Sequence, residues 1–167
     1  MQNSIPSLNA PKGWKELMSF SEAGLKSFVS SESDSDRLRV KYYHNKRTGA
    51  FMGKVWFGPG AEGPPGNAHG GAMAAVLDEG MGVAAWLAGH KVVAAKLTVR
   101  FREMLPTGTV TTLEAWVKRV DGRKIEMKGC LIGPEGQIYC ASEGLFVQVD
   151  LSSSIIELSE PDAMIMK

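Results

Sequence analysis

The sequence has little cysteine and almost no net charge. Its 167 residues include two cysteines, and the formal net charge is +1 at pH 7. Two thiols are too few for the disulfide framework of a small secreted domain or for a cysteine-rich zinc site. A nearly neutral chain also lacks the positive potential that binds nucleic acids. We therefore predict no metal, no nucleic-acid partner and one globular domain with its own hydrophobic core.

Sorting signals and a membrane span are also missing from the pattern. The segment from Met1 to Gly13 lacks the basic and then apolar pattern of a secretory signal, and the acidic residues within 1–36 are atypical of a transit peptide. The apolar run Gly70–Ala88 is nearly long enough to span a bilayer. However, Asp78 and Glu79 at its centre would each cost about 2.5–3.5 kcal/mol there. We expect a cytoplasmic protein without a membrane segment.

A regularly patterned region lies between two less regular segments. Residues 1–36 form a polar extension, with one short helix predicted around Ser21–Val29, and residues 151–167 form a tail that packs on the surface or on a partner. Residues 37–150 are predicted to be the domain itself. Alternating and β-rich patterns predict six strands. They are Leu38–Tyr43, Ala50–Phe57, Val92–Glu103, Thr109–Val120, Arg123–Ile132 and Gln137–Val149.

One long helix interrupts these strands. Gly70–Ala88 is apolar on almost all sides, which is typical of a buried helix. Asp121-Gly122 and Pro134-Glu135-Gly136 are turn signals that join the last strands as antiparallel hairpins. The fold class is therefore α+β, with a curved antiparallel meander of about six strands wrapped around one central helix.

Candidate chemistry begins where a glycine-rich loop enters this helix. Asn67-Ala68-His69-Gly70-Gly71 leads into the first helical turn, whose backbone N–H groups have no partner within the helix. Gly70 and Gly71 allow a substrate carbonyl to approach the backbone closely. Such donors stabilise a developing oxyanion, and one of them can contribute roughly 3–4 kcal/mol in a transition state.

Asp78 is the second candidate. A carboxylate on an apolar helix is costly unless it is hydrogen-bonded or used in catalysis. In the first case it would pair with a neighbouring element; in the second it would act as a general base on water or as a nucleophile. Thioesters suit this pair of groups, because a thiolate leaving group with a conjugate acid near pKa ~8.5 needs little help from an acid. The Gly-x-Ser-x-Gly element of serine hydrolases is absent from the sequence.

The spacing of these groups predicts an oligomer. Nine residues separate His69 from Asp78, which places them on roughly opposite faces of the helix and about 13–14 Å apart along its axis. Two antiparallel copies of the helix can instead bring Gly70 of one copy near Asp78 of the other. A two-fold dimer would then contain two equivalent shared sites.

The remaining polar candidates each have two interpretations. His69 either fixes the loop by hydrogen-bonding the backbone or serves as an acid–base group. Lys96, Thr98, Arg100 and Arg102 share one strand face, and Arg123 and Lys124 follow a turn; these cations bind CoA phosphates or form a solvated face.

The two cysteines have two interpretations as well. If the segments around Pro134-Glu135-Gly136 form a hairpin, Cys130 and Cys140 could face each other across it and form a disulfide. In the alternative they are two reduced thiols packed as small hydrophobic groups.

The run from His69 to Glu79 resembles the signature of the PaaI-like branch of hotdog thioesterases, in the 4-hydroxybenzoyl-CoA thioesterase superfamily. The lead-in Gly63-Pro64-Pro65-Gly66 and the turn Asp121-Gly122-Arg123-Lys124 are similar to the thioesterase-superfamily-member proteins. The resemblance covers about residues 38–149 and implies a hotdog fold, an acyl-CoA substrate, no cofactor, and dimers that pair into tetramers. The residues it implies are Asp78 as the catalytic carboxylate across the interface, Gly70 as the carbonyl-polarising donor, His69, Asn67 and Gly71 beside them, and CoA contacts at Arg100, Arg102, Arg123 and Lys124.

This chain departs from the family pattern at two positions. Ala94 stands where some relatives carry a Ser or Thr helper, and Gly63 stands where some carry an Asn, with Asn67 nearer the histidine. Two other functions therefore remain as alternatives. One is an acyl-thioester hydratase or dehydratase, and the other is a non-catalytic acyl-CoA-binding protein that keeps the scaffold.

Overall fold

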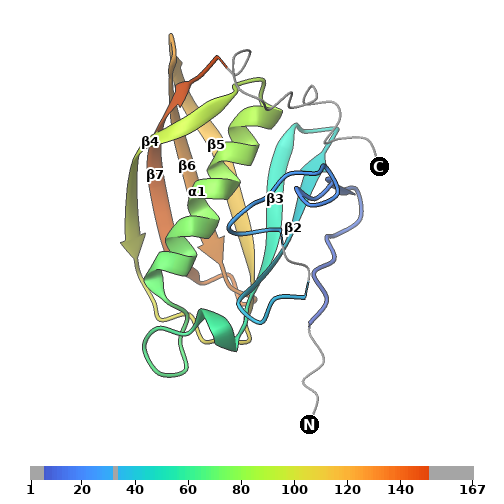
Figure 1. Cartoon of the computed structure of the whole chain (residues 1–167), viewed down its shortest axis with the longest axis vertical. Coiled ribbons are helices and arrows are strands. Elements are labelled where there is room, and N and C mark those ends of the chain that lie inside the picture. The colour runs from blue at the N-terminus through green and yellow to red at the C-terminus, as the bar shows by residue number, and fades with distance from the viewer. Residues whose placement is uncertain (1–5, 32–33, 151–167) are drawn as a thin grey trace.

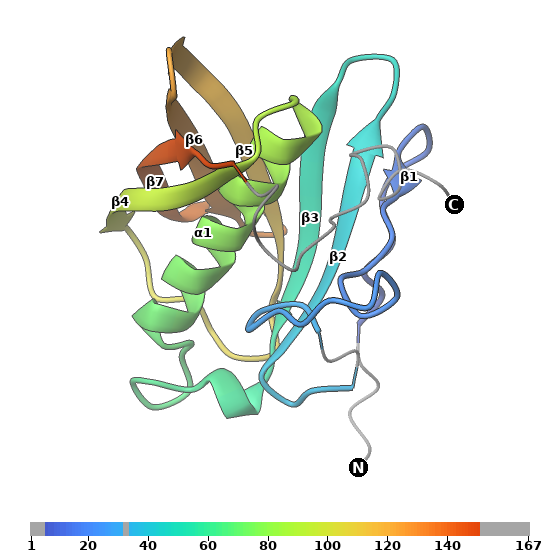
Figure 2. The same ribbon diagram turned by 45° about the horizontal axis from the view of Figure 1, so that its top comes forward.

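A computed structural model describes residues 6–31 and 34–150, so the predicted tail at 151–167 lies outside the described residues. One antiparallel sheet curves around one helix, as Figures 1 and 2 show. The elements in chain order are β1 (Lys15–Glu16), β2 (Leu38–Asn45), β3 (Ala50–Phe57), a 3₁₀ turn (Pro59–Ala61), α1 (Gly70–Leu87), β4 (Val92–Phe101), β5 (Val110–Asp121), β6 (Lys124–Ile132) and β7 (Ile138–Gln148). This architecture confirms the α+β hotdog prediction.

The order of strands in the sheet corrects the predicted simple meander. The order is β1-β2-β3-β5-β6-β7-β4, with all neighbours antiparallel. β3 therefore pairs with β5 and not with β4, because α1 carries the chain across the concave face and returns it at the far edge. β4 pairs with β7 there, and among the described strands nothing pairs with its other side.

The prediction of a short helix around Ser21–Val29 is wrong. The chain makes two separate turns there, at 20–24 and 28–30. In the first, the Ala23 N–H donates to Ser19 O and the Leu25 N–H donates to Phe20 O. Gly24 has a φ of +73°, the left-handed conformation that ends a helix. The extension instead contributes β1 and two side chains of the hydrophobic core, Leu17 and Val29.

α1 lies in the concave face of the sheet (Figure 2). Its inner side is formed by fully buried apolar residues, among them Val76, Leu77 and Met81. One stripe, which includes Gly71, Ala75 and Asp78, is only partly covered within the chain, so the prediction of a helix buried on every side fails for this stripe. No helix among residues 6–31 and 34–150 is long and apolar enough to cross a membrane.

Substitution by alanine is expected to have opposite effects on stability at two glycines in the middle of α1. A Cβ at Gly80 would collide with Cδ2 of the buried Leu113, whereas the nearest atom to a Cβ at Gly82 is Phe146 Cε1 at 4.0 Å. Ala is favoured over Gly in a helix by about 0.8–1 kcal/mol, but overpacking a core costs about 1–3 kcal/mol. Gly82→Ala is therefore expected to raise the melting temperature by roughly 2–4 °C, and Gly80→Ala to lower it. Thermal denaturation of the two variants side by side checks this, and equal shifts would contradict it.

Candidate active site

The start of α1 is fixed by His69. Its Nδ1 accepts a hydrogen bond from the Gly71 N–H at 2.8 Å, so His69 is the N-cap of the helix. The backbone on either side is tied down as well, because the His69 N–H donates to Ala61 O at 2.7 Å and the Ala68 N–H donates to Leu105 O at 2.8 Å. This geometry supports the loop-fixing interpretation of His69.

The cap makes His69 testable by two substitutions. Losing a side-chain N-cap costs about 0.5–2 kcal/mol, whereas Asn is among the best cap residues. His69→Ala is therefore expected to lower the free energy of unfolding by about 1 kcal/mol, and His69→Asn to retain most of it. Urea unfolding of the three proteins measures this. If the Asn variant were as unstable as the Ala variant, the capping role would be wrong.

Gly70 is the first residue of α1, and its N–H is free. No described residue accepts a hydrogen bond from it. The other N–H groups of the first turn do have acceptors: the Gly71 N–H donates to the His69 side chain, and the next two N–H groups donate to His69 O. The ring of Phe101, at the end of β4, lies against Gly70, with Cζ 3.2 Å from the position of a Cβ there. The described chain thus leaves one backbone donor unpaired at the positive end of the helix dipole.

Asp78 lies two turns further along the helix and is half-buried. Burial, and after it the neighbouring charge of Glu79, raises the pKa of the Asp78 carboxyl. No described side chain hydrogen-bonds this carboxylate, so the interpretation in which it pairs with a neighbouring element is not supported within the chain. A half-desolvated carboxylate without a partner is a stronger base than an exposed one.

Glu79 is held by hydroxyl groups, which sequence reasoning missed. Ser30 Oγ donates to Glu79 Oε1 at 2.5 Å, Tyr42 OH donates to the same oxygen at 2.7 Å, and Ser27 Oγ donates to Oε2. Burial, together with the charge of Glu79, raises the pKa of the Tyr42 hydroxyl well above its usual value. The two serines lie about fifty residues from Glu79 in the sequence, and no local pattern links them to it.

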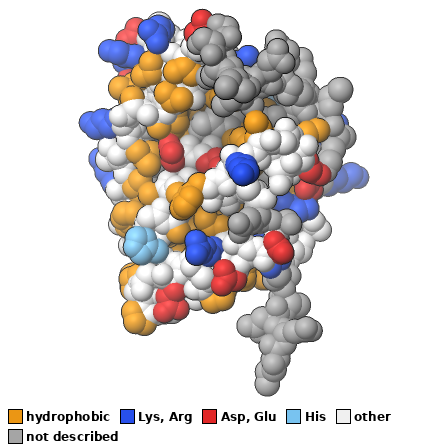
Figure 3. All heavy atoms as spheres, in the orientation of Figure 1, with side chains coloured by type: hydrophobic (Ala, Val, Ile, Leu, Met, Phe, Trp, Pro, Cys, Tyr) orange, Lys and Arg blue, Asp and Glu red, His pale blue; other side chains and the backbone are white. Residues whose placement is uncertain are grey.

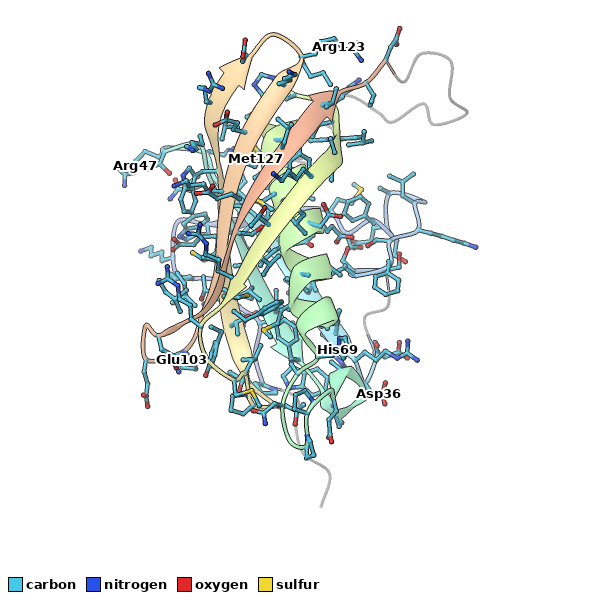
Figure 4. All side chains as sticks on the ribbon, turned by 90° about the vertical axis from the view of Figure 1, so that its left-hand side faces the viewer. Asp36, Arg47, His69, Glu103, Arg123 and Met127 are labelled. Carbon is cyan, nitrogen blue, oxygen red and sulfur yellow. The ribbon has the colours of Figure 1, made fainter. Side chains whose placement is uncertain are left out.

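The predicted cations do not form one cluster within the chain. Arg100 pairs with Ala141 near one end of β7, whereas Lys124 pairs with Val147 near the other, a separation of about 20 Å at the rise of a strand. Figure 4 shows Arg123 and Glu103 at opposite ends of the sheet. Arg123 Nη2 also donates to Gln148 O at 3.0 Å, so this guanidinium holds the end of β7.

The Asn67 side chain stabilises the loop before α1. The Asn67 side-chain amide donates to Pro65 O at 2.9 Å and closes the glycine- and proline-rich turn before the helix.

Both cysteine thiols are free. Cys130 pairs with Ala141, and Cys140 pairs with the core residue Leu131, so the thiols point to opposite faces of the sheet. The cross-strand disulfide is therefore wrong, and burial raises the pKa of Cys140 to about 12.

A cavity of about 620 Å³ opens beside the start of α1. This volume lies within the range of small-molecule sites. His69, Gly71 and Ala72 form its helical side, and the N-terminal extension forms the side opposite. Its lining residues are Ser27, Phe28, Val29, Ser35, Arg37, Leu38, Gly60, Ala61, Glu62, His69, Gly71 and Ala72.

Comparisons with known proteins point to one family. Residues 65–140 match the model of the thioesterase superfamily. Acyl-coenzyme A thioesterase THEM5 of Mus musculus is 35% identical over 95 residues, which are 56% of this chain and 38% of that protein. THEM4 of Xenopus laevis, another acyl-coenzyme A thioesterase, is 28% identical over 149 residues, or 87% of this chain and 67% of that protein. The chain thus spans about two fifths of the THEM5 sequence that it matches.

Solved structures agree in fold. A thioesterase superfamily protein is 34% identical with a TM-score of 0.62, over 66% of this chain and 54% of that chain. The PaaI protein of Escherichia coli is 15% identical with a TM-score of 0.58, over 60% and 73% of the two chains. A Streptococcus pneumoniae thioesterase protein solved with coenzyme A is 16% identical with a TM-score of 0.58, over 60% and 78%.

Proposed function

We propose that the described domain, whose residues 65–140 match the model of the thioesterase superfamily, hydrolyses an acyl-CoA thioester to a free acid and CoA. The observation that carries the proposal is the pair of unsatisfied groups on α1. The Gly70 N–H lacks an acceptor and the Asp78 carboxylate lacks a donor among the described residues, in a chain whose other helix-start groups are paired. The solved relative that holds coenzyme A supports the choice of substrate.

Each group has one role in the proposed reaction. The thioester carbonyl oxygen accepts a hydrogen bond from Gly70 N–H, which stabilises the negative charge that forms when water adds to the carbonyl carbon. Asp78 takes the proton of that water as a general base, and its raised pKa strengthens it for this step. The C–S bond then breaks, and the thiolate of CoA leaves and receives the proton. In the alternative route the Asp78 carboxylate attacks the carbonyl carbon, the C–S bond breaks and the CoA thiolate leaves, and water then hydrolyses the resulting anhydride to the free acid and regenerates Asp78.

We further propose that the two groups of one site come from two chains. Within a chain, Gly70 and Asp78 are about 12 Å apart along the helix axis. A two-fold axis near Ala74, midway between them, would bring Gly70 of one copy beside Asp78 of the other. Around this point the partly covered side of α1 carries the small residues Ala74 and Ala75, which permit close approach.

The free edge of β4 supports the same dimer. β4 is a long strand with one side unpaired among the described strands, and its Phe101 is 54% exposed. Proteins usually cover such edges, because the unpaired backbone groups of an exposed edge strand readily pair with a strand of another chain. Figure 3 shows apolar side chains gathered on the face that carries α1, with acidic side chains among them near its centre. The family resemblance adds that such dimers pair into tetramers, which the particle mass in solution tests.

Release of free thiol from a panel of acyl-CoAs tests the proposed reaction. The proposal predicts thiol release with at least one member of the panel. Water addition across an enoyl-CoA without thiol release would indicate the hydratase instead. Saturable binding of acyl-CoA without either reaction would indicate the non-catalytic protein, for which Ala94 in place of a hydroxyl residue is the motivating feature.

A further inference from the structure

We propose that residues 19–31 form a strap that is latched onto α1 through Glu79 and closes one wall of the acyl-binding cavity, so that the strap determines which acyl groups are accepted. This inference rests on the proposed thioesterase function. It assigns a role to the N-terminal extension and to the cavity of about 620 Å³ beside the helix start.

The latch is a carboxylate held by three hydroxyl groups. Ser27 and Ser30, both from the strap, donate to different oxygens of Glu79, and Tyr42 of β2 donates to one of them. No described Lys or Arg forms an ion pair with this half-buried carboxylate. Because a buried charge is costly without hydrogen bonds, the strap and the helix depend on each other at this point.

Packing holds the strap at both ends. Upstream of it, the Leu17 N–H donates to Tyr42 O at 2.8 Å, which ties the chain to the edge of the sheet. Downstream, Val29 is 6% exposed and belongs to the hydrophobic core. Between these points Phe20 packs against the hydrophobic core, and with Gly82, Val83 and Trp86 it lines a small cavity of about 170 Å³. The middle of the strap therefore depends on the Glu79 latch more than on close packing.

The strap forms the cavity wall that faces the helix start. Phe28 and Val29 line the cavity together with Leu38, Ala61 and Ala72, all of them apolar. The Phe28 side chain is 88% exposed, so an apolar group bound in the cavity would remove part of this ring from water. His69 and Gly71, the residues on either side of Gly70, line the same cavity, so the cavity lies beside the proposed position of the thioester carbonyl.

The test compares acyl-CoAs of increasing chain length. Phe28→Ala alters the wall directly, and the double variant Ser27→Ala/Ser30→Ala releases the latch without changing the charge beside Asp78. We expect each to change the ratio of kcat/KM between long and short substrates by about 10-fold, the lower end of what a lost apolar contact contributes to discrimination.

Matched controls come from exposed positions away from the cavity. Ser21→Ala, which removes a strap hydroxyl that does not touch Glu79, and Val120→Ala, at the exposed end of β5, are expected to leave the chain-length profile unchanged. An unchanged profile in both strap variants, with wild-type thiol release intact, would overturn the strap and leave the thioesterase function standing.

A second measurement does not depend on catalysis. Amide hydrogen exchange within residues 19–31 is expected to slow when a non-hydrolysable long-chain thioether analogue of acyl-CoA binds, and to accelerate in Ser27→Ala/Ser30→Ala. Free CoA is expected to leave it unchanged. If wild type released no thiol from any substrate, the proposed function would fail, while the exchange of the strap would still decide the inference. An exchange rate of residues 19–31 that does not change when the analogue binds would refute the strap.

Discussion

Asp78→Asn is expected to lower thiol release from acyl-CoA by at least about 100-fold, the low end of what a general base contributes, while the protein becomes more resistant to heat. Asn has the same shape as Asp but cannot accept a proton from water. Asp121→Asn, at the exposed β5–β6 turn, is the matched control and is expected to retain activity. Activity within 10-fold of wild type in Asp78→Asn would contradict the catalytic role.

The gain in stability follows from the direction of the pKa shift. Burial and the Glu79 charge raise the pKa of Asp78 in the folded protein, so the folded state binds this proton more tightly than the unfolded state does. The contribution of the group is therefore most favourable at low pH and is lost as pH rises through the folded pKa. At pH 7 the ionised carboxylate destabilises the fold, and the neutral Asn removes this cost. Thermal melts at pH 7 and at about pH 4 check the sign, because the advantage of Asn should shrink in acid.

Gly70→Pro is expected to reduce kcat by about 100- to 1,000-fold, as loss of an oxyanion-hole donor does. Proline has no N–H, yet it is favoured at the first helical position. His69 before it has φ −65° and ψ 135°, the extended conformation that a residue before proline adopts. The substitution therefore removes the donor while the local backbone conformation can persist.

Gly70→Ala is the control for the added bulk. It introduces a Cβ near the Phe101 ring, as the proline does, but keeps the N–H. We expect the Ala variant to lose much less activity than the Pro variant, with circular dichroism of both variants showing an intact fold. Equal losses would assign the effect to crowding against Phe101 and would contradict the oxyanion role.

Local patterns predicted most of the elements of this fold. The bounds of α1 were predicted to within one residue because a glycine-rich loop and a turn enclose one apolar run. On β4, the predicted alternation is confirmed, since Thr98 pairs with the outward-facing Glu143 and Leu97 with Gly144 on the helix side. These features depend on neighbours within a few residues, which a sequence displays directly.

Contacts between distant segments were beyond the sequence. The position of β4 at the sheet edge depends on its pairing with β7, and the Glu79 latch depends on serines from the N-terminal extension. The predicted helix at Ser21–Val29 failed because Gly24, which an amphipathic pattern tolerates, takes a left-handed conformation. At the candidate site, the local motif placed His69, Gly70 and Asp78 on one helix, but it did not reveal the cavity wall supplied by Phe28.

Subunit complementation tests the shared site most directly. Asp78→Asn and Gly70→Pro chains carrying different tags are coexpressed, and the mixed dimer is purified through both tags. If each site combines Gly70 of one chain with Asp78 of the other, the mixed dimer contains one intact site, and its thiol release should be half that of the wild-type dimer, although each parent is inactive. If both groups of a site came from the same chain, every site in the mixed dimer would carry a lesion, and its activity would stay at the level of the parents.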